Sequence, residues 1–264
     1  MDVLRPRSLE EALSLRAEHP DALAIRGGTD VMVELNFDRV RPDAILDLGE
    51  VAELGGWSVE DDTLRLGAGL TYAEIEHGGL ASELPALAEA SRTVGSPQIR
   101  NRGTIGGNLG TASPAGDALP PLLVCEAEVE LASVRGVRRL ALQAFIRGPK
   151  QNVLAEDELI TAVVVPQADG AQTFMKVGPR NAMVIAVCSL AVAVVEERDE
   201  VRASFGSAGP VPGLVRLPLD DAGGLPEAVM AAASPIDDVR GSAAYRRHAL
   251  GVLARRGLSR CLAA

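Results

Sequence analysis

The sequence contains few aromatic residues, cysteines and histidines, and almost no lysine. Phenylalanine, tyrosine and tryptophan together make up 3% of the 264 residues, and Lys150 and Lys176 are the two lysines. The three cysteines and three histidines are scattered, so none has the close spacing of a zinc site or an iron–sulfur cluster. We therefore expect no protein-bound metal, and we interpret the cysteines as small buried apolar residues.

Positive charge and long apolar runs are also scarce. The 26 basic and 36 acidic residues give a formal net charge of -10. Because nucleic-acid binding needs clustered positive charge, this balance disfavours a nucleic-acid partner. The longest nearly apolar run, residues 182–195, is shorter than the roughly 20 residues of a membrane-spanning helix, and the first residues do not form a secretory signal. We expect a cytoplasmic chain without a membrane span.

Local patterns predict a mixture of helices and strands. Capping-box patterns begin at Ser8 and at Thr71, and apolar runs bounded by turn residues are typical of strands. The expected helices cover residues 9–18, 84–91 and 242–262, and the expected strands cover residues 22–25, 44–48, 57–59, 64–67, 127–132, 159–165, 174–177, 184–195 and 201–205. No regular strand–helix–strand period or internal repeat is present, so the pattern predicts an α+β protein.

A first glycine-rich loop follows the strand expected at residues 22–25. It reads Arg26-Gly27-Gly28-Thr29-Asp30, and adjacent glycines allow backbone N–H groups to approach an anion. Thr29 or Asp30 can cap the next helix. A glycine pair after a strand is more often a simple turn, so this loop alone does not identify a phosphate site. Because a carboxylate repels a bare phosphate, we expect Asp30 to form a cap or to accept from a ribose or amide donor.

A second loop, residues 93–117, is rich in glycine, hydroxyl and amide side chains. It contains few large apolar residues and cannot form a core by itself. One interpretation is a long surface loop with Asp117 capping a helix that begins near Leu119. The other is a second backbone cradle, so that the two loops grip the phosphates of an extended dinucleotide from opposite sides. Neither loop has the three-glycine Rossmann spacing, so a dinucleotide here requires another fold.

The second loop resembles the signature of the flavin-binding subunit of the molybdenum hydroxylases, the family of xanthine dehydrogenase and aerobic carbon monoxide dehydrogenase medium subunits. Four further stretches resemble that family in the same order, namely residues 25–30, 157–160, 176–183 and 242–247. The resemblance therefore extends over nearly the whole chain.

The resemblance implies an FAD-binding domain of the PCMH, or vanillyl-alcohol-oxidase, type at residues 1–166, with subdomains at about 1–53 and 54–166. A smaller α+β C-terminal domain is expected at residues 170–264. FAD would lie between the two N-terminal subdomains. The implied cofactor-binding residues are Arg26, Gly27, Gly28, Thr29, Asp30, Ile99, Thr104, Ile105, Gly106, Gly107, Asn108, Thr111, Ser113, Asp117, Ile160 and Lys176.

Within that set the resemblance implies distinct roles. The glycine pairs and their neighbours Thr29, Thr104 and Asn108 would hold the diphosphate. Residues Thr111, Ser113 and Asp117 would contact the ribityl chain or the ring, with Ile160 and Lys176 near the flavin. No residue is implied as a catalytic acid or base.

Two of these residues each have two possible roles. The family usually has a small residue where this chain has Arg26, which either contacts the diphosphate or points to solvent. Lys176 is either a flavin-side cation or a solvated lysine at a strand end.

The implied function is that of an oxidoreductase component, the FAD-binding electron-transfer subunit of a xanthine dehydrogenase-like molybdenum hydroxylase. It would receive electrons from a separate [2Fe-2S] small subunit, supplied by a molybdopterin large subunit, and pass them through FAD to NAD, oxygen or another acceptor. Separate subunits are implied because the chain has no recognisable cluster ligands. The alternatives are a stand-alone FAD oxidoreductase of the same fold and an assembly protein that has lost flavin.

Overall fold

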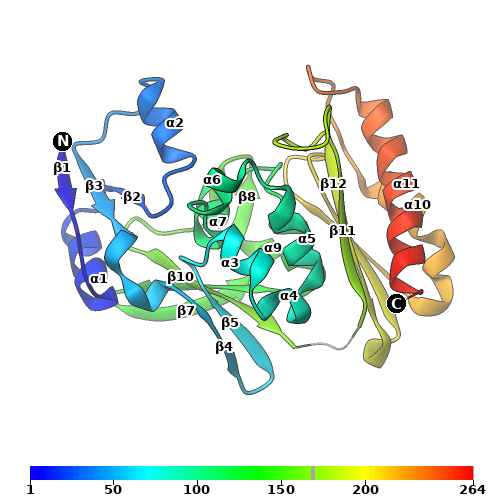
Figure 1. The fold of residues 1–264 in the computed structure, drawn as a ribbon, viewed down its shortest axis with the longest axis horizontal. Coiled ribbons are helices and arrows are strands. Elements are labelled where there is room, and N and C mark those ends of the chain that lie inside the picture. Colours follow the sequence, from blue (N-terminus) through cyan, green and yellow to red (C-terminus); the bar gives the residue numbers. More distant parts are fainter. Residues whose placement is uncertain (168–169, 264) are drawn as a thin grey trace.

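The computed structural model describes residues 1–167 and 170–263. Three larger β-sheets follow one another from the N-terminal to the C-terminal side of the chain, with helices between and outside them (Figure 1). The α+β architecture expected from the sequence is confirmed. A small sheet of β8 (Ile146–Gly148) and β9 (Gln151–Asn152) completes the strands.

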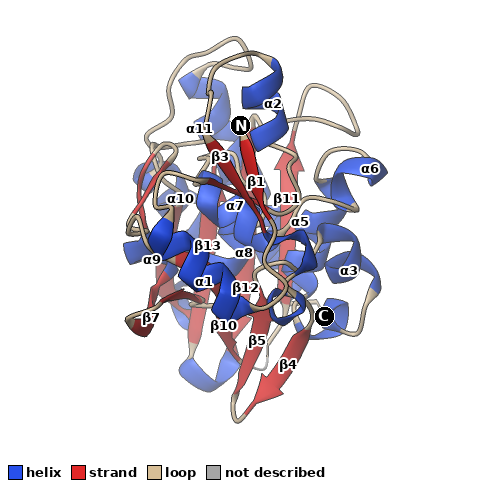
Figure 2. Cartoon of the chain, turned by 90° about the vertical axis from the view of Figure 1, so that its left-hand side faces the viewer, coloured by secondary structure: helices blue, strands red, loops and turns tan. Residues whose placement is uncertain are grey.

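The N-terminal sheet is small and parallel. Its strands are β1 (Asp2–Leu4), β3 (Ala44–Asp47) and β2 (Leu23–Ile25), in this order across the sheet. Helix α1 (Leu9–Glu18) begins at Ser8, whose hydroxyl accepts from the Glu11 N–H, as the capping pattern predicts. Figure 2 looks onto this layer, with α1 in front of the central strands. Short helices α2 (Val31–Asn36), η1 (Leu48–Glu50) and η2 (Ala52–Leu54) follow β2 and β3.

The central sheet is antiparallel and carries the main core. Its order is β4 (Trp57–Glu60), β5 (Thr63–Gly67), β10 (Leu159–Pro166), β6 (Glu128–Ser133) and β7 (Gly136–Ala141). The register of β10 on β6 shifts between Ile160 and Ala162, which makes Thr161 the extra residue of a bulge. Buried Glu130 on β6 accepts from Arg65, Arg139 and Thr161, so this carboxylate joins its own strand to the three strands β5, β7 and β10.

Seven short helices cover one face of that sheet. They are α3 (Tyr72–His77), α4 (Leu80–Glu83), α5 (Pro85–Thr93), α6 (Pro97–Arg100), α7 (Ile105–Thr111), α8 (Leu119–Val124) and α9 (Leu142–Phe145). The capping box predicted at Thr71 is confirmed, because Thr71 and Glu74 exchange both hydrogen bonds. Ile105 and Leu109 of α7 are fully buried against Val163 and the rest of the core.

The C-terminal sheet is packed between two groups of helices. Its antiparallel strands are β11 (Gln172–Val177), β12 (Cys188–Val195), β13 (Glu200–Gly206) and β14 (Gly213–Pro218). Helices α10 (Leu225–Ala232) and α11 (Ala243–Cys261) follow the strands. The short helix η3 (Glu196–Arg198) lies between β12 and β13, and η4 (Leu219–Gly224) lies between β14 and α10. Helices α10 and α11 cover the outer face (Figure 1). On the inner face, Phe174 and Ala191 pack on Ala86 and Ala90 of α5. All eight residues of β12 are buried, as expected of a strand covered on both faces.

Several expectations need correction. The glycine-rich segment 93–117 is not one long loop, because α6 and α7 form within it. The strand expected at 184–195 begins only at Cys188. Elements β7, β14 and α10 were not predicted. Of the cysteines, Cys188 and Cys261 are buried, whereas Cys125 is half-buried.

Candidate functional site

A cleft of about 740 Å³ lies where the two N-terminal sheets meet and extends to the C-terminal part. Its walls come from the end of α1, the loop after β2, helix α7 and the segment that follows it, β10, and Val184 and Ile185 before β12. A cleft of this volume is in the range of small-molecule and cofactor sites. The two glycine-rich segments, more than sixty residues apart in sequence, therefore face the same space.

The first glycine loop forms a cradle of free backbone donors. None of the N–H groups of residues 27–31 donates to another group in the part of the chain that the structure describes. Gly28 has a φ of +76°, a conformation that favours glycine. At Gly27 a Cβ would lie 2.0 Å from the carbonyl oxygen of Arg102, so only glycine permits this approach of the two segments. Consecutive unpaired N–H groups in such a turn are suited to an anion.

The second segment is built differently. The Ile105 N–H donates to Leu70, the Gly106 N–H to Ala68, and the Gly107 N–H to the Thr104 hydroxyl at 3.0 Å. The expected second backbone cradle is therefore not formed, because α7 and its neighbours use these donors. Gly106 is still required, since a Cβ there would lie 2.6 Å from the Ala68 carbonyl oxygen.

Two side-chain oxygens in this cleft have no partner. Asn108 Oδ1 and Asp117 Oδ1 are both buried and make no hydrogen bond within the described residues, and both residues line the cleft. Buried acceptors are nearly always paired, so these two oxygens are suited to accept from hydroxyl or N–H donors of a ligand in the cleft. The second segment thus contributes side-chain acceptors where the first contributes backbone donors.

Asp117 is held by a lysine. The Lys176 ammonium donates to Asp117 Oδ2 at 2.6 Å, and also to the carbonyl oxygens of Thr93 at 2.9 Å and Val184 at 3.2 Å. Burial raises the pKa of Asp117 to about 6, against the opposing effect of Lys176. Asp117 does not cap α8, because Ala118 occupies that position, and Lys176 is not a solvated lysine, since 6% of its side chain is exposed.

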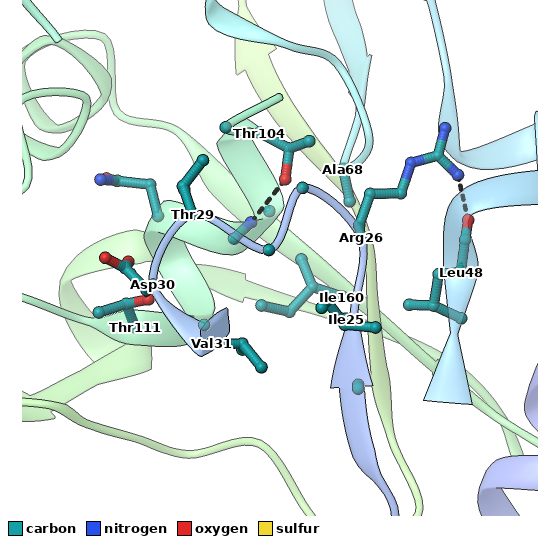
Figure 3. A pocket seen from close by; sticks show the side chains of 18 of the residues that line it. Ile25, Arg26, Thr29, Asp30, Val31, Leu48, Ala68, Thr104, Thr111 and Ile160 are labelled. Atoms are coloured by element: carbon teal, nitrogen blue, oxygen red, sulfur yellow. Dashed lines mark hydrogen bonds between the residues drawn. The ribbon is translucent and has the colours of Figure 1, made fainter. Parts of the chain in front are cut away.

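A second contact joins the two segments on the outer side of the cleft. Thr111 Oγ1 donates to Asp30 Oδ2 at 2.8 Å, and Figure 3 shows the two side chains together. Asp30 occupies the N-cap position of α2, but its carboxylate makes no cap hydrogen bond. The expected capping role of Thr29 or Asp30 is therefore wrong, because Thr111 takes the Asp30 carboxylate.

The Arg26 side chain turns away from the loop that it begins. Its guanidinium donates to the carbonyl oxygens of Leu48 and of Val51, the latter at 2.9 Å, and Figure 3 shows it directed toward Leu48. The guanidinium is thus directed to these carbonyls and not to the N–H cradle, although Arg26 is half-buried and lines the cleft. Its implied contact with the diphosphate stays a prediction. Burial lowers the pKa of Arg26 from its ordinary value.

The remaining predicted residues divide into two groups. Ile99, Ser113 and Ile160 line the cleft, together with the glycine, threonine, asparagine and aspartate residues of the predicted set. Ile105 and Lys176 are not among the described residues that line it. Ile105 is a core residue at the start of α7, and Lys176 lies behind Asp117. The implied cofactor-binding role of Ile105 stays a prediction.

Several residues of the cleft wall were not predicted from the sequence. Arg16, Tyr72, Val184 and Ile185 all line it. Tyr72 follows directly after the capping Thr71 and is one of two tyrosines, which was a usable signal. Arg16 had no signal, because an arginine near the end of an amphipathic helix is ordinary.

Two further observations concern metal-ligand groups and membrane-spanning helices. Within residues 1–167 and 170–263 there is no group of three or more histidine, cysteine, aspartate or glutamate side chains placed to hold a metal ion. In the same residues no helix combines the length and apolar character that crossing a membrane requires.

Comparison with known proteins gives relatives over most of the chain. The nicotinate dehydrogenase FAD-subunit of Eubacterium barkeri is 40% identical over 197 residues, covering 72% of this chain and 67% of that protein. The xanthine dehydrogenase FAD-binding subunit of Escherichia coli O157:H7 is 31% identical over 278 residues, covering 98% of this chain and 95% of that protein.

The fold has close counterparts among solved structures. Reconstituted CO dehydrogenase from Oligotropha carboxidovorans is similar with a TM-score of 0.91 and 25% sequence identity, covering 100% of this chain and 98% of that chain. The family model described as "FAD binding domain in molybdopterin dehydrogenase" matches residues 1–168, well over half of the sequence. The chain therefore belongs to this family of FAD-binding molybdopterin dehydrogenase components.

Proposed function

We propose that the chain is the electron-transfer subunit of a molybdenum hydroxylase complex and holds FAD in the cleft described above. The observation that carries the proposal is the set of unpaired N–H groups at residues 27–31, which faces a cleft that also contains two unpaired buried acceptors. A negatively charged diphosphate suits the donors, and the hydroxyl and N–H groups of a flavin nucleotide suit the acceptors.

The residues present fit FAD in three respects. The N–H groups of residues 27–31 would hold the diphosphate, and Gly107 allows close approach on the opposite wall, where Thr104 and Asn108 also lie. Asn108, Ser113 and Asp117 would take donors of the ribityl chain or the ring. Ile99 and Ile160 supply apolar surface for a ring system.

The protein's own part in the chemistry is binding and orientation. Bound FAD supplies the redox step, because it can accept electrons from one carrier and give them to another. The chain positions the cofactor between a rigid backbone cradle and a buried carboxylate, and the packed core under α7 keeps that wall fixed. We propose no catalytic acid or base in this chain.

The proposal includes partners and an acceptor. Several relatives are by name subunits of dehydrogenases, among them the 6-hydroxypseudooxynicotine dehydrogenase complex subunit alpha of Paenarthrobacter nicotinovorans. By analogy we propose a separate [2Fe-2S] subunit that delivers electrons and a separate molybdopterin subunit that oxidises the organic substrate. NAD, oxygen or another acceptor would take electrons from FAD.

The division of the chain and its location are parts of the same proposal. We propose an FAD-binding domain at residues 1–166 and a C-terminal domain at 170–264, in keeping with a separate hydrophobic cluster on the C-terminal sheet. The cytoplasmic location expected from the sequence stays a prediction.

The test is a visible absorption spectrum of the purified chain after incubation with FAD and desalting, alone and together with its candidate partner subunits. We expect a flavin spectrum with one FAD for each chain. A chain that retains no flavin under either condition would contradict the proposal and favour a flavin-less assembly protein. Retained flavin that is reduced directly by an organic substrate, with no partner present, would favour a stand-alone FAD oxidoreductase.

A further inference from the structure

We propose that Lys176 is a positioning residue: it acts on the flavin site through Asp117 and couples FAD binding to the docking of the C-terminal sheet. The inference rests on the proposed function, because it concerns the same cleft. It assigns to Lys176 a role other than the flavin contact that the sequence implied.

The Lys176 ammonium joins three separate segments. It donates to Thr93 at the end of α5, to Asp117 in the segment after α7, and to Val184 in the loop before β12. An ammonium has three N–H donors, and these three contacts account for all of them. No donor is left for a ligand, so a direct hydrogen bond from Lys176 to FAD would require one of these contacts to break.

The two carboxylate oxygens of Asp117 have different surroundings. One oxygen, Oδ2, accepts from Lys176, while Oδ1 is buried, lacks a partner within the described residues and belongs to a residue of the cleft wall. The side chains of Lys176 and Asp117 are 6% and 8% exposed, so the contact between them is shielded from water. Lys176 thereby fixes the direction of the oxygen that is left for the ligand.

The strand that carries Lys176 is itself held in register. Thr173 Oγ1 and the Phe174 N–H both donate to Glu89 Oε2 of α5, at 2.9 and 2.6 Å. These contacts fix β11 two to three residues before Lys176. A shift of β11 along α5 would therefore move the ammonium away from Asp117.

A second link reaches the same segment. The Ser207 N–H, just after β13, donates to the Pro114 carbonyl oxygen at 2.8 Å. The C-terminal sheet thus contacts the segment between Ser113 and Asp117 at two points. The two contacts make the conformation of this segment depend on the docking of the sheet. Since the segment lines the cleft, docking affects the shape of the cleft.

The experiment is a double-mutant cycle on FAD affinity. Lys176→Met, Asp117→Asn and the double variant are titrated with FAD by flavin fluorescence, and thermal unfolding is followed with and without FAD. We expect Lys176→Met to raise the dissociation constant roughly tenfold or more, because removal of one partner of a buried charge pair is costly. In the Asp117→Asn background the same change should have little further effect, since Lys176 acts through Asp117.

Two controls separate positioning from a general loss of stability. Arg202→Met removes another buried cation of the C-terminal sheet, and its partners Val124, Glu200 and Glu126 do not line the cleft. It should lower the melting temperature but leave FAD affinity unchanged. Lys176→Arg keeps the charge and should recover part of the lost affinity, and it replaces Lys176→Met in the cycle if that variant does not fold.

The outcomes are distinct. A Lys176 effect of equal size in both backgrounds would overturn the inference and indicate direct contact with FAD. Wild-type affinity in Lys176→Met would also overturn it. Failure of the wild-type chain to bind FAD, alone or with partners, would instead contradict the proposed function, so the two failures cannot be confused.

Discussion

Gly27 and Arg102 approach so closely that a Cβ on Gly27 would lie 2.0 Å from the Arg102 carbonyl oxygen. Because backbone lies on both sides of this contact, Gly27→Ala must push the two segments of the cleft apart. We expect the dissociation constant for FAD to rise by about tenfold or more, a change that corresponds to at least about 1.4 kcal/mol. Fluorescence titration measures it.

The matched control is Gly223→Ala. Nothing lies within 4 Å of a Cβ at Gly223, and its φ is not in the left-handed region. This variant should bind FAD as the wild type does. Equal affinities for Gly27→Ala and Gly223→Ala would show that the close approach at Gly27 is unrelated to the cofactor.

Thr104 caps α7 by accepting from the Gly107 N–H. Thr104→Ala should lower the free energy of unfolding by about 1 kcal/mol, the usual cost of losing an N-cap, and should also weaken FAD binding because Thr104 lines the cleft. Chemical denaturation and FAD titration measure the two effects. Ser242→Ala, which removes the cap of α11, should cost similar stability with FAD affinity unchanged. If both variants weaken binding alike, the effect of Thr104 is one of stability alone.

Arg26 links the first glycine loop to the turns η1 and η2 through two carbonyl oxygens. Arg26→Met should therefore lower the free energy of unfolding by about 1–2 kcal/mol. It should leave the salt dependence of FAD binding unchanged, because the guanidinium does not face the N–H cradle. Titrations at low and high ionic strength check this, with exposed Arg41→Met as control. A shallower salt dependence in Arg26→Met would mean that Arg26 contacts the diphosphate after all.

Asp117 gives the flavin-free protein a pH dependence of defined sign. Its pKa is raised from 3.8 to about 6, mainly by burial, so the folded chain binds this proton more tightly than the unfolded chain. The resulting stabilisation is fully present below about pH 4 and is lost as the pH rises through about 6. A shift of this size corresponds to about 3 kcal/mol.

The measurement is the free energy of unfolding without FAD at several pH values between about 4 and 7. Relative to Asp117→Asn, the wild type should lose stability as the pH rises across this window. Burial opposes the effect, but hydrogen bonds from Arg65, Arg139 and Thr161 lower the pKa of Glu130. This contribution is the same in both proteins, so the comparison with Asp117→Asn removes it. Parallel curves for the wild type and Asp117→Asn would contradict the assignment.

Features encoded locally were predicted well. The helices that begin after Ser8, Thr71 and Ser242 have side-chain caps, and their positions were predicted to within a residue or two where a range was given. Helix α7 was missed because Gly106, Gly107 and Gly110 have low helix propensity. Burial of Ile105 and Leu109, which is tertiary, overcomes that penalty.

The functional contacts depend on distant segments and were only partly predictable. The glycine pairs indicated where an anion could lie, but which N–H groups stay free depends on partners such as Leu70 and Ala68. The Asp117–Lys176 pair spans two parts of the chain, and no spacing rule connects its members. The hydrogen bonds of Arg26 were not predictable for the same reason, since the carbonyls that accept from it follow β3.

The bulge in β10 changes which of its side chains share a face of the sheet. Ile160 and Val163 both face the helical side of the central sheet, although an uninterrupted strand would place them on opposite faces. Thr161 is the extra residue that shifts the alternation of side chains between the two faces. A homologous strand with one residue fewer at this point would present the same side chains to this face of the sheet. A single-residue gap here therefore marks a lost bulge and leaves the alignment of the positions on this face intact.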